Sequence, residues 1–183
     1  MGKFLSTVDV LNQIESNTKI FTNNQVQICV DLERIIDELN PVNLPYAVIV
    51  NKSGDFESVS SLNSYTGILE TEISVFVVLD TNKDLTGAKA QITTTDVRID
   101  LSSCLGGWVP STNATTPMMG PSWDFAYMSG SRVIYEYKFS ITEQVNPEDG
   151  YCEEYDDLTE IDITGEYYKN DKLISEQEVI ITK

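Results

Sequence analysis

The chain has 183 residues, of which 41% are hydrophobic, so it is long enough to bury the core of one domain and to carry a small appended subdomain. Its 29 aspartates and glutamates outnumber 12 lysines and arginines, and the resulting net charge of −17 excludes a conventional nucleic-acid binder because phosphates are repelled. Histidine is absent, which excludes serine–histidine and cysteine–histidine catalysis and the usual zinc ligand.

The N-terminal part of the chain predicts two amphipathic elements. Residues 3–16 carry an apolar stripe at helical spacing and predict a helix. A second helical stripe follows over residues 26–39, although its first residues are β-branched enough to form a short strand instead. Pro41 then ends this segment. The first stripe consists of Phe4, Val8, Leu11 and Ile14.

Two strands and a helix that crosses them are predicted next. Residues 44–50 form an apolar run typical of a buried strand, and residues 51–65 are interpreted as a polar loop or a hairpin arm. Residues 67–80 place apolar residues mostly on alternate positions and predict a long strand. The helix is predicted between residue 81 and the Gly106–Gly107 pair. Its apolar residues form two adjoining stripes: Leu85, Ala88, Ile92 and Ile99, and beside them Val97, Leu101 and Leu105.

A hairpin with many aromatic residues is predicted over residues 122–141. The sequence MSGS supplies its turn, and apolar residues occupy alternate positions on both sides of the turn. Trp123, Phe125 and Tyr127 are predicted to share one face of the first strand. The corresponding face of the second strand consists of Val133, Tyr135, Tyr137, Phe139 and Ile141.

This hairpin is also the predicted contact surface of the protein. Packing against the crossing helix accounts for one face, whereas tyrosines and strand edges also suit contacts with other proteins. Arg132 lies beside the turn, where a salt bridge to a neighbouring subunit and an exposed ion pair worth about 0–1 kcal/mol are both compatible with the sequence. The residues predicted to form a subunit or partner interface are Trp123, Phe125, Tyr127, Arg132, Tyr135 and Tyr137.

The order of the elements predicts an α+β fold. It consists of a mostly antiparallel sheet with N-terminal helices and a crossing helix packed on one face. Residues 1–142 form this domain, and residues 143–183 extend it with an acidic linker, 143–157, and a C-terminal β-hairpin. The three cysteines predict no disulfide framework, and no apolar run is long enough to span a bilayer. We expect a protein that is made in the cytoplasm and has no membrane partner.

The sequence contains no motif of a known catalytic or metal site. We therefore expect no catalytic residue, no bound metal and no cofactor. Because acidic residues are numerous, a carboxylate-dependent or metal-dependent enzyme remains the alternative from a different functional class. The acidic cluster that such an enzyme would use consists of Glu148, Asp149, Glu153, Glu154, Asp156 and Asp157.

Taken together, the elements resemble the tail terminator, or tail-completion, proteins of long-tailed bacteriophages. The resemblance lies in an N-terminal helix, the strands PYAVIV and ETEISVFVVL, a crossing helix, and a hairpin that ends in RVIYEYKFSI. It covers roughly residues 1–142 and consists of the order and the residue patterns of the elements rather than an invariant motif. The chain departs from the family in the length of residues 26–39 and in the extension 143–183.

The resemblance implies a structural role without catalysis. Family members form a hexameric ring that caps the tail tube, stops its growth and docks the head-side connector. The implied partners are other copies of the chain, the tail-tube protein, the connector or stopper protein, and the sheath protein if the tail is contractile. DNA passes through the lumen without specific binding, which suits an acidic wall. The implied location is the tail or neck of the virion, and the alternatives within this class are a head–tail stopper or a tail-tube protein.

Overall fold

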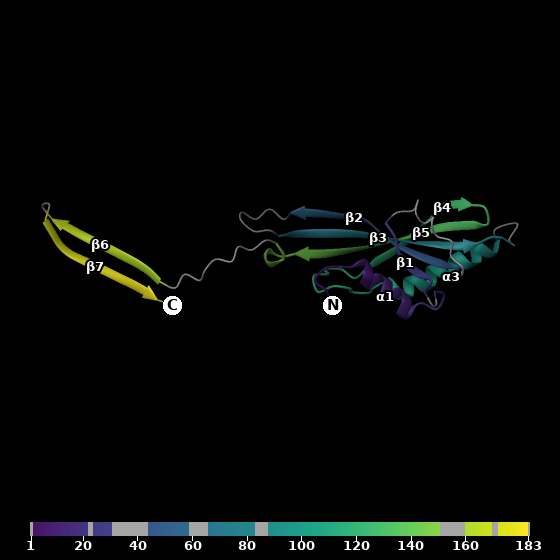
Figure 1. Cartoon of the computed structure of the whole chain (residues 1–183), viewed down its shortest axis with the longest axis horizontal. Helices are drawn as coiled ribbons and strands as arrows, with labels where there is room; N and C mark the ends of the chain where they lie inside the picture. Colours follow the sequence, from purple (N-terminus) through teal and green to yellow (C-terminus); the bar gives the residue numbers. More distant parts are fainter. Residues whose placement is uncertain are drawn as a thin grey trace. The chain divides into compact units, whose positions relative to one another are not determined.

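The computed structural model describes residues 2–21, 24–30, 44–58, 66–82, 88–150, 160–169 and 172–182. The chain divides into two compact units, Met1–Gly150 and Tyr151–Lys183. The first unit contains the helices and a five-stranded sheet, and the second contains a two-stranded sheet (Figure 1). The α+β class predicted from the sequence is confirmed.

The sheet of the first unit is mostly antiparallel, as predicted. Its strands follow the order β1-β2-β3-β5-β4, so β1 and β4 form the two edges. The pair of β1 and β2 is parallel, and the other described pairs are antiparallel. The predicted strands and the predicted aromatic hairpin are thereby confirmed. The strands are β1 (Val26–Ile28), β2 (Tyr46–Ser58), β3 (Gly67–Asp80), β4 (Met119–Ser129) and β5 (Arg132–Val145).

Two segments resolve alternatives that the sequence left open. The segment predicted as a helix over residues 26–39 begins with strand β1, because Val26 and Ile28 are β-branched and the segment pairs with β2. The short-strand alternative is therefore confirmed for Val26–Ile28, and residues 31–43 lie outside the described part of the chain. Residues 51–58 extend β2 as an exposed arm that pairs with β3, which confirms the hairpin-arm interpretation.

The first unit ends later than the predicted boundary at residue 142. β5 continues to Val145, and a 3-10 helix, Pro147–Asp149, follows it. The prediction of an acidic linker is therefore wrong for residues 143–149, because Glu143 and Val145 are buried and continue the alternation of β5. Residues 151–159 lie outside the described residues. The second unit consists of the antiparallel strands β6 (Glu160–Lys169) and β7 (Lys172–Thr182).

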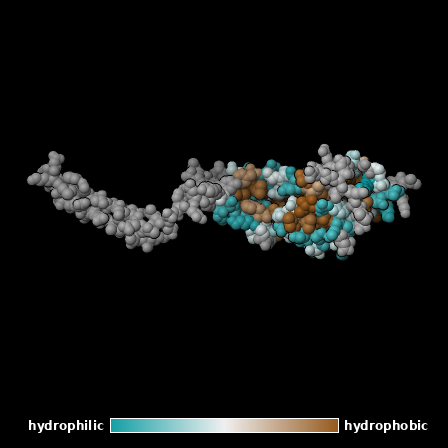
Figure 2. Space-filling view, viewed as in Figure 1, coloured by the Kyte–Doolittle hydropathy of each residue, from teal (hydrophilic) through white to brown (hydrophobic). Residues whose placement is uncertain are grey.

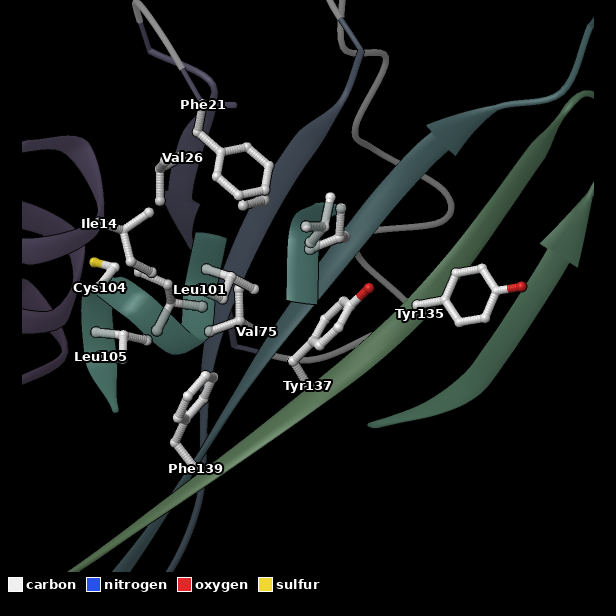
Figure 3. Close-up of a cluster of buried hydrophobic side chains, with 14 of the residues drawn as sticks. Ile14, Phe21, Val26, Val75, Leu101, Cys104, Leu105, Tyr135, Tyr137 and Phe139 are labelled. Atoms are coloured by element: carbon white, nitrogen blue, oxygen red, sulfur yellow. The ribbon is translucent and has the colours of Figure 1, made fainter. Parts of the chain in front are cut away.

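Helices α1 (Thr7–Asn17) and α3 (Ala88–Leu105) pack on one face of the sheet. Their buried residues join alternate residues of β2, β3 and β5 in one apolar core (Figure 3). α3 ends at Leu105, directly before the Gly106–Gly107 pair, as predicted. The other face of the sheet carries a smaller buried cluster of Val48, Val50, Phe76, Val78 and Ile134.

The buried face of α1 differs in part from the predicted stripe, and the helix begins at Thr7. The Ser6 hydroxyl caps α1 by accepting a hydrogen bond from the Val8 N–H at 3.2 Å. The helix buries Val10 and Ile14, whereas Val8 is 53% exposed. The prediction is thus correct for Ile14 and wrong for Val8.

α3 also buries a face that differs in part from the prediction. Ile92 and Ile99 are 66% and 57% exposed, so their predicted place in the core is wrong. The adjoining stripe around Val97 is buried as predicted. Thr94 is buried beside it, because its hydroxyl donates to the Ala90 carbonyl at 2.8 Å and leaves no unpaired polar group. A sequence pattern that treats every threonine as exposed therefore predicts the wrong buried face for α3.

Cys104 is expected to resist alkylation in the native protein. Its thiol is buried and donates to the Gln13 carbonyl at 3.2 Å. Burial, and to a lesser extent the Asp100 carboxylate, raises the pKa of this thiol to about 11. At about pH 8 roughly one thiol in a thousand is then the reactive thiolate. Mass spectrometry after iodoacetamide treatment should find Cys104 unmodified in the native chain and modified in the unfolded chain, and rapid native labelling would contradict this.

Candidate interaction surface

Strand β4 lies at an edge of the sheet and carries several exposed apolar side chains. Within the described part of the first unit it pairs with β5 alone. An edge strand offers backbone N–H and C=O groups to a further strand. Apolar residues also reach the surface elsewhere in this unit, between hydrophilic ones (Figure 2). We define the β4 surface as the exposed large apolar residues of this strand: Met119, Trp123, Phe125, Tyr127 and Met128.

Trp123 and Phe125 are positioned by residues beneath and beside them. The centre of each ring lies 6.1 Å from that of Tyr135, at interplanar angles of 54° and 83°. The Arg98 guanidinium of α3 lies 5.8 Å from the centre of the Trp123 ring. Tilted ring pairs and a cation over an indole are attractive arrangements that favour one side-chain position. The two rings are nevertheless 42% and 58% exposed, so a partner would meet apolar side chains already in place.

Tyr127 does not share a face with Trp123 and Phe125, and that prediction is wrong. The pairing of β4 with β5 shifts register between Phe125 and Tyr127. As a result Phe125 pairs with Tyr135, whereas Tyr127 pairs with Ile134, which belongs to the opposite face of the sheet. An extra residue in one strand moves the following side chain to the other face. The β4 surface therefore has aromatic residues on both faces of the sheet.

The other predicted interface residues lie elsewhere. Tyr135 and Tyr137 are 6% and 0% exposed, so they belong to the core and not to a surface (Figure 3). The Tyr137 hydroxyl donates to the Thr94 carbonyl of α3 at 3.0 Å, and burial raises the pKa of this phenol above its usual value. Arg132 is half-buried at the start of β5, in register with Asp80 and Ser129. The structure thus brings Trp123 and Phe125 together on an exposed face above the buried Tyr135, whereas Tyr127 lies on the opposite face and Arg132 lies at the start of β5.

Three residues of this region are missed by sequence reasoning. Met119 and Met128 are 59% and 57% exposed on β4, but the sequence places them in a loop and in the turn. Their long apolar side chains are the signal that could have marked them. Arg98 lies on α3 and reaches Trp123 from a distant part of the sequence. No local pattern could have predicted this contact.

The described part of the predicted acidic cluster has a structural role. Asp149 accepts hydrogen bonds from the Lys3 ammonium at 2.8 Å, the Asn113 amide at 2.9 Å and the Asn146 backbone N–H at 2.9 Å. Both carboxylate oxygens are therefore occupied by groups of the first unit. Glu148 is exposed, and the four acidic residues of the cluster that follow Gly150 lie outside the described residues.

Glu143 joins neighbouring segments of the first unit through hydrogen bonds to its buried carboxylate. Its Oε1 accepts hydrogen bonds from the Leu5 N–H at 2.8 Å and from the Ser111 hydroxyl, and the residue is 1% exposed. The Gly2 carbonyl also accepts a hydrogen bond from the Thr112 N–H. These contacts tie the residues before α1 to the end of β5 and to the segment between α3 and β4. Asp149 and Glu143 therefore each join segments of the first unit that are distant in sequence.

Replacing Asp149 with asparagine is expected to reduce the sensitivity of the fold to acid. The hydrogen bond from Lys3, followed by that from the Asn146 N–H, lowers the pKa of Asp149. A lowered pKa means that the carboxylate stabilises the fold above about pH 4, and this contribution is lost as the pH falls through the lower folded-state pKa. Denaturant unfolding below about pH 4 should show a smaller loss of stability for Asp149→Asn than for the control Asp55→Asn on the exposed β2 arm. If the stability of the two variants depends on pH in the same way, the stabilising role of the Asp149 carboxylate is contradicted.

No protein-family model matches the chain, and no curated protein matches it either. Within the part that the structure describes, no helix is long and apolar enough to cross a membrane. The same residues include no group of three or more acidic or cysteine side chains placed to hold a metal ion. The β4 surface and the acidic charge are therefore the features from which a function can be inferred.

Proposed function

We propose that the chain is a bacteriophage tail terminator, a structural protein that works as a ring of identical subunits. The observation that carries the proposal is the β4 surface, where positioned aromatic residues lie on an edge strand. A surface with exposed apolar side chains and an available strand edge is suited to contact with another protein. In this proposal the ring is a hexamer, as the resemblance over residues 1–142 implies, and it caps the tail tube beneath the head-side connector.

The charge of the chain supports a place around a DNA passage. With a net charge of −17, the wall of such a passage repels DNA and lets it move without specific binding. The absence of histidine, the commonest general base, supports a structural rather than a catalytic role. The proposed partners are other copies of the chain, the tail-tube protein, the connector or stopper protein, and the sheath protein of a contractile tail. The proposed location is the tail or neck of the virion.

Negative-stain electron microscopy of the protein mixed with tail tubes of its phage tests this proposal. We expect a single ring at the head-proximal end of each tube. A stopper would instead bind the connector side and leave bare tubes unchanged, and a tail-tube protein would lengthen the tubes. Tubes that remain uncapped, or that carry the protein along their length, overturn the proposal.

A matched pair of variants links this result to the β4 surface. Phe125→Asp places a charge on the β4 surface and is expected to abolish ring formation. Ile92→Asp adds the same charge at an exposed apolar residue on the outer side of α3 and is expected to leave the rings intact. If both variants lose the rings, the added charge alone explains the loss, and the β4 surface has no specific role in ring formation.

A further inference from the structure

The side of the β4 surface that faces α3 contains a cation. The Arg98 guanidinium lies 5.8 Å from the centre of the Trp123 ring, and Phe125 lies two residues further along the same strand face. Beneath the two rings Tyr135 is buried, and its hydroxyl accepts a hydrogen bond from the Gln91 amide at 3.4 Å. We define the Arg98 site as the guanidinium, the amide and the two exposed rings of this group.

Arg98 differs from several other cations of the first unit because it has no carboxylate partner there. Within the described residues, Lys3, Lys52 and Lys138 each form a salt bridge with a carboxylate. Arg98 forms none with any described residue, and its guanidinium donates no hydrogen bond to them, although the side chain is half-buried. A guanidinium carries five N–H donors, so it is able to bind a carboxylate that comes from elsewhere.

The carboxylates nearest in sequence are turned away from Arg98. Asp96 and Asp100 lie two residues before and after it on α3, and helix residues two apart do not face each other. The Asp100 carboxylate is also occupied, since it accepts hydrogen bonds at 2.8 Å and 3.0 Å from two backbone N–H groups of the segment after α1. Asp124 lies between the two exposed rings in sequence and therefore belongs to the opposite face of β4.

A second copy of the chain carries the charge that this site lacks. Each copy has 29 acidic and 12 basic residues, so the surface that a second copy presents is dominated by carboxylates. Two copies with a net charge of −17 repel each other unless cations lie where they meet. Arg98 places a positive charge beside the exposed Trp123 and Phe125 rings, where an ion pair and apolar contacts form together.

We propose that the Arg98 site binds a carboxylate of a second copy at the contact between copies. The planar guanidinium donates two parallel hydrogen bonds to that carboxylate, and the Trp123 and Phe125 rings shield the pair from water. Shielding strengthens the attraction, whereas a fully exposed pair contributes little. This inference deepens the proposed function by naming the chemical group that the β4 surface recognises, and it rests on the self-association that the proposed function requires.

Two substitutions on α3 that remove the same charge test this inference. Arg98→Gln removes the guanidinium of the site, and Lys89→Gln removes an exposed ammonium from the same helix. Because both variants have the same net charge, the general repulsion between copies increases equally. At about 0.15 M salt, sedimentation is expected to show association about 30-fold or more weaker for Arg98→Gln than for Lys89→Gln, and the ratio is expected to shrink towards about 1 M salt.

Arg98→Lys shows whether the planar guanidinium matters beyond its charge. Lysine keeps the positive charge but cannot donate two parallel hydrogen bonds to one carboxylate. Its association is therefore expected to lie between that of the unchanged chain and that of Arg98→Gln. Circular dichroism of each variant checks that the fold is retained. An Arg98→Lys variant that associates more weakly than Arg98→Gln overturns the ion pair.

The fluorescence of Trp123 reports directly on whether the site is covered. The chain has two tryptophans, so Trp108→Phe leaves Trp123 as the only one. Acrylamide is expected to quench Trp123 readily in the dilute monomer, because this residue is 42% exposed, and less readily at concentrations where copies associate. Adding Arg98→Gln to Trp108→Phe is expected to raise the concentration needed for this protection about 30-fold. Equal quenching in free and associated copies overturns the inference.

The outcomes separate this inference from the proposed function. Equal association of Arg98→Gln and Lys89→Gln overturns the contact between copies at the Arg98 site, and the proposed function stands if rings of Arg98→Gln still cap tail tubes. An unchanged chain that stays monomeric at every salt concentration, or a Trp123 that is protected only by tail tubes, also overturns the inference. A selective loss in Arg98→Gln, with an unchanged chain that never binds tail tubes, supports the inference and overturns the proposed function.

Discussion

Replacing Tyr137 with alanine is expected to lower the free energy of unfolding by about 3–5 kcal/mol, the range found when a large buried aromatic side chain is truncated. Tyr137 is completely buried between β5 and α3, and its hydroxyl donates to the Thr94 carbonyl. Truncation removes this hydrogen bond and leaves a cavity beneath the helix. Urea unfolding followed by circular dichroism measures the loss.

Two further variants show whether this loss comes from the core. Tyr137→Phe keeps the ring and removes the hydrogen bond, so a loss of about 1 kcal/mol is expected. Trp123→Ala truncates a larger ring that is 42% exposed, and it is expected to cost less than Tyr137→Ala. Equal losses for Tyr137→Ala and Trp123→Ala would contradict the division of these aromatic residues between core and surface.

Replacing Gly120 with alanine is expected to cost at least about 2 kcal/mol of folding stability. Gly120 is the second residue of β4 and has φ at +126°, a region that side chains strongly disfavour. A Cβ atom there would lie 2.6 Å from the Lys138 carbonyl oxygen of the paired strand and 3.1 Å from the Phe139 ring. Because the closest atom belongs to the backbone, the clash can be relieved only by moving β4 away from β5. Thermal unfolding of the variant measures the effect.

Gly107 provides the matched control for this prediction. It also has a positive φ, +79°, but a Cβ atom would meet nothing within 4 Å. Gly107→Ala therefore adds backbone strain alone, which costs roughly 1–2 kcal/mol. If Gly120→Ala is as stable as Gly107→Ala, the start of β4 moves away from β5 without a loss of folding stability, which contradicts the prediction.

The strands could be predicted from the sequence because successive side chains of a strand point to opposite faces, which produces an alternation of apolar and polar residues. β3 and the β4–β5 hairpin follow this pattern, and the turn residues separate the two hairpin strands. The end of the first unit could not be predicted, since an acidic residue is usually solvated. Glu143 is buried only because Leu5 and Ser111, both distant in sequence, donate hydrogen bonds to it.

The candidate surface could be predicted in part for a related reason. Alternation shows that Tyr135 and Tyr137 share a face, but it does not show that α3 covers that face. Trp123 and Phe125 follow the same pattern at the sheet edge and remain exposed. The displacement of Tyr127 depends on one extra residue in β4 relative to β5, which composition and periodicity do not reveal.

The register shift in β4 has a consequence for any strand that adds to this edge. Trp123 and Phe125 lie on one face of the sheet, and Tyr127 pairs into the opposite face. An added strand is therefore flanked by aromatic rings on both sides. Such a strand would cover apolar area on both faces of the sheet at once, so its release would return aromatic side chains on both faces to water.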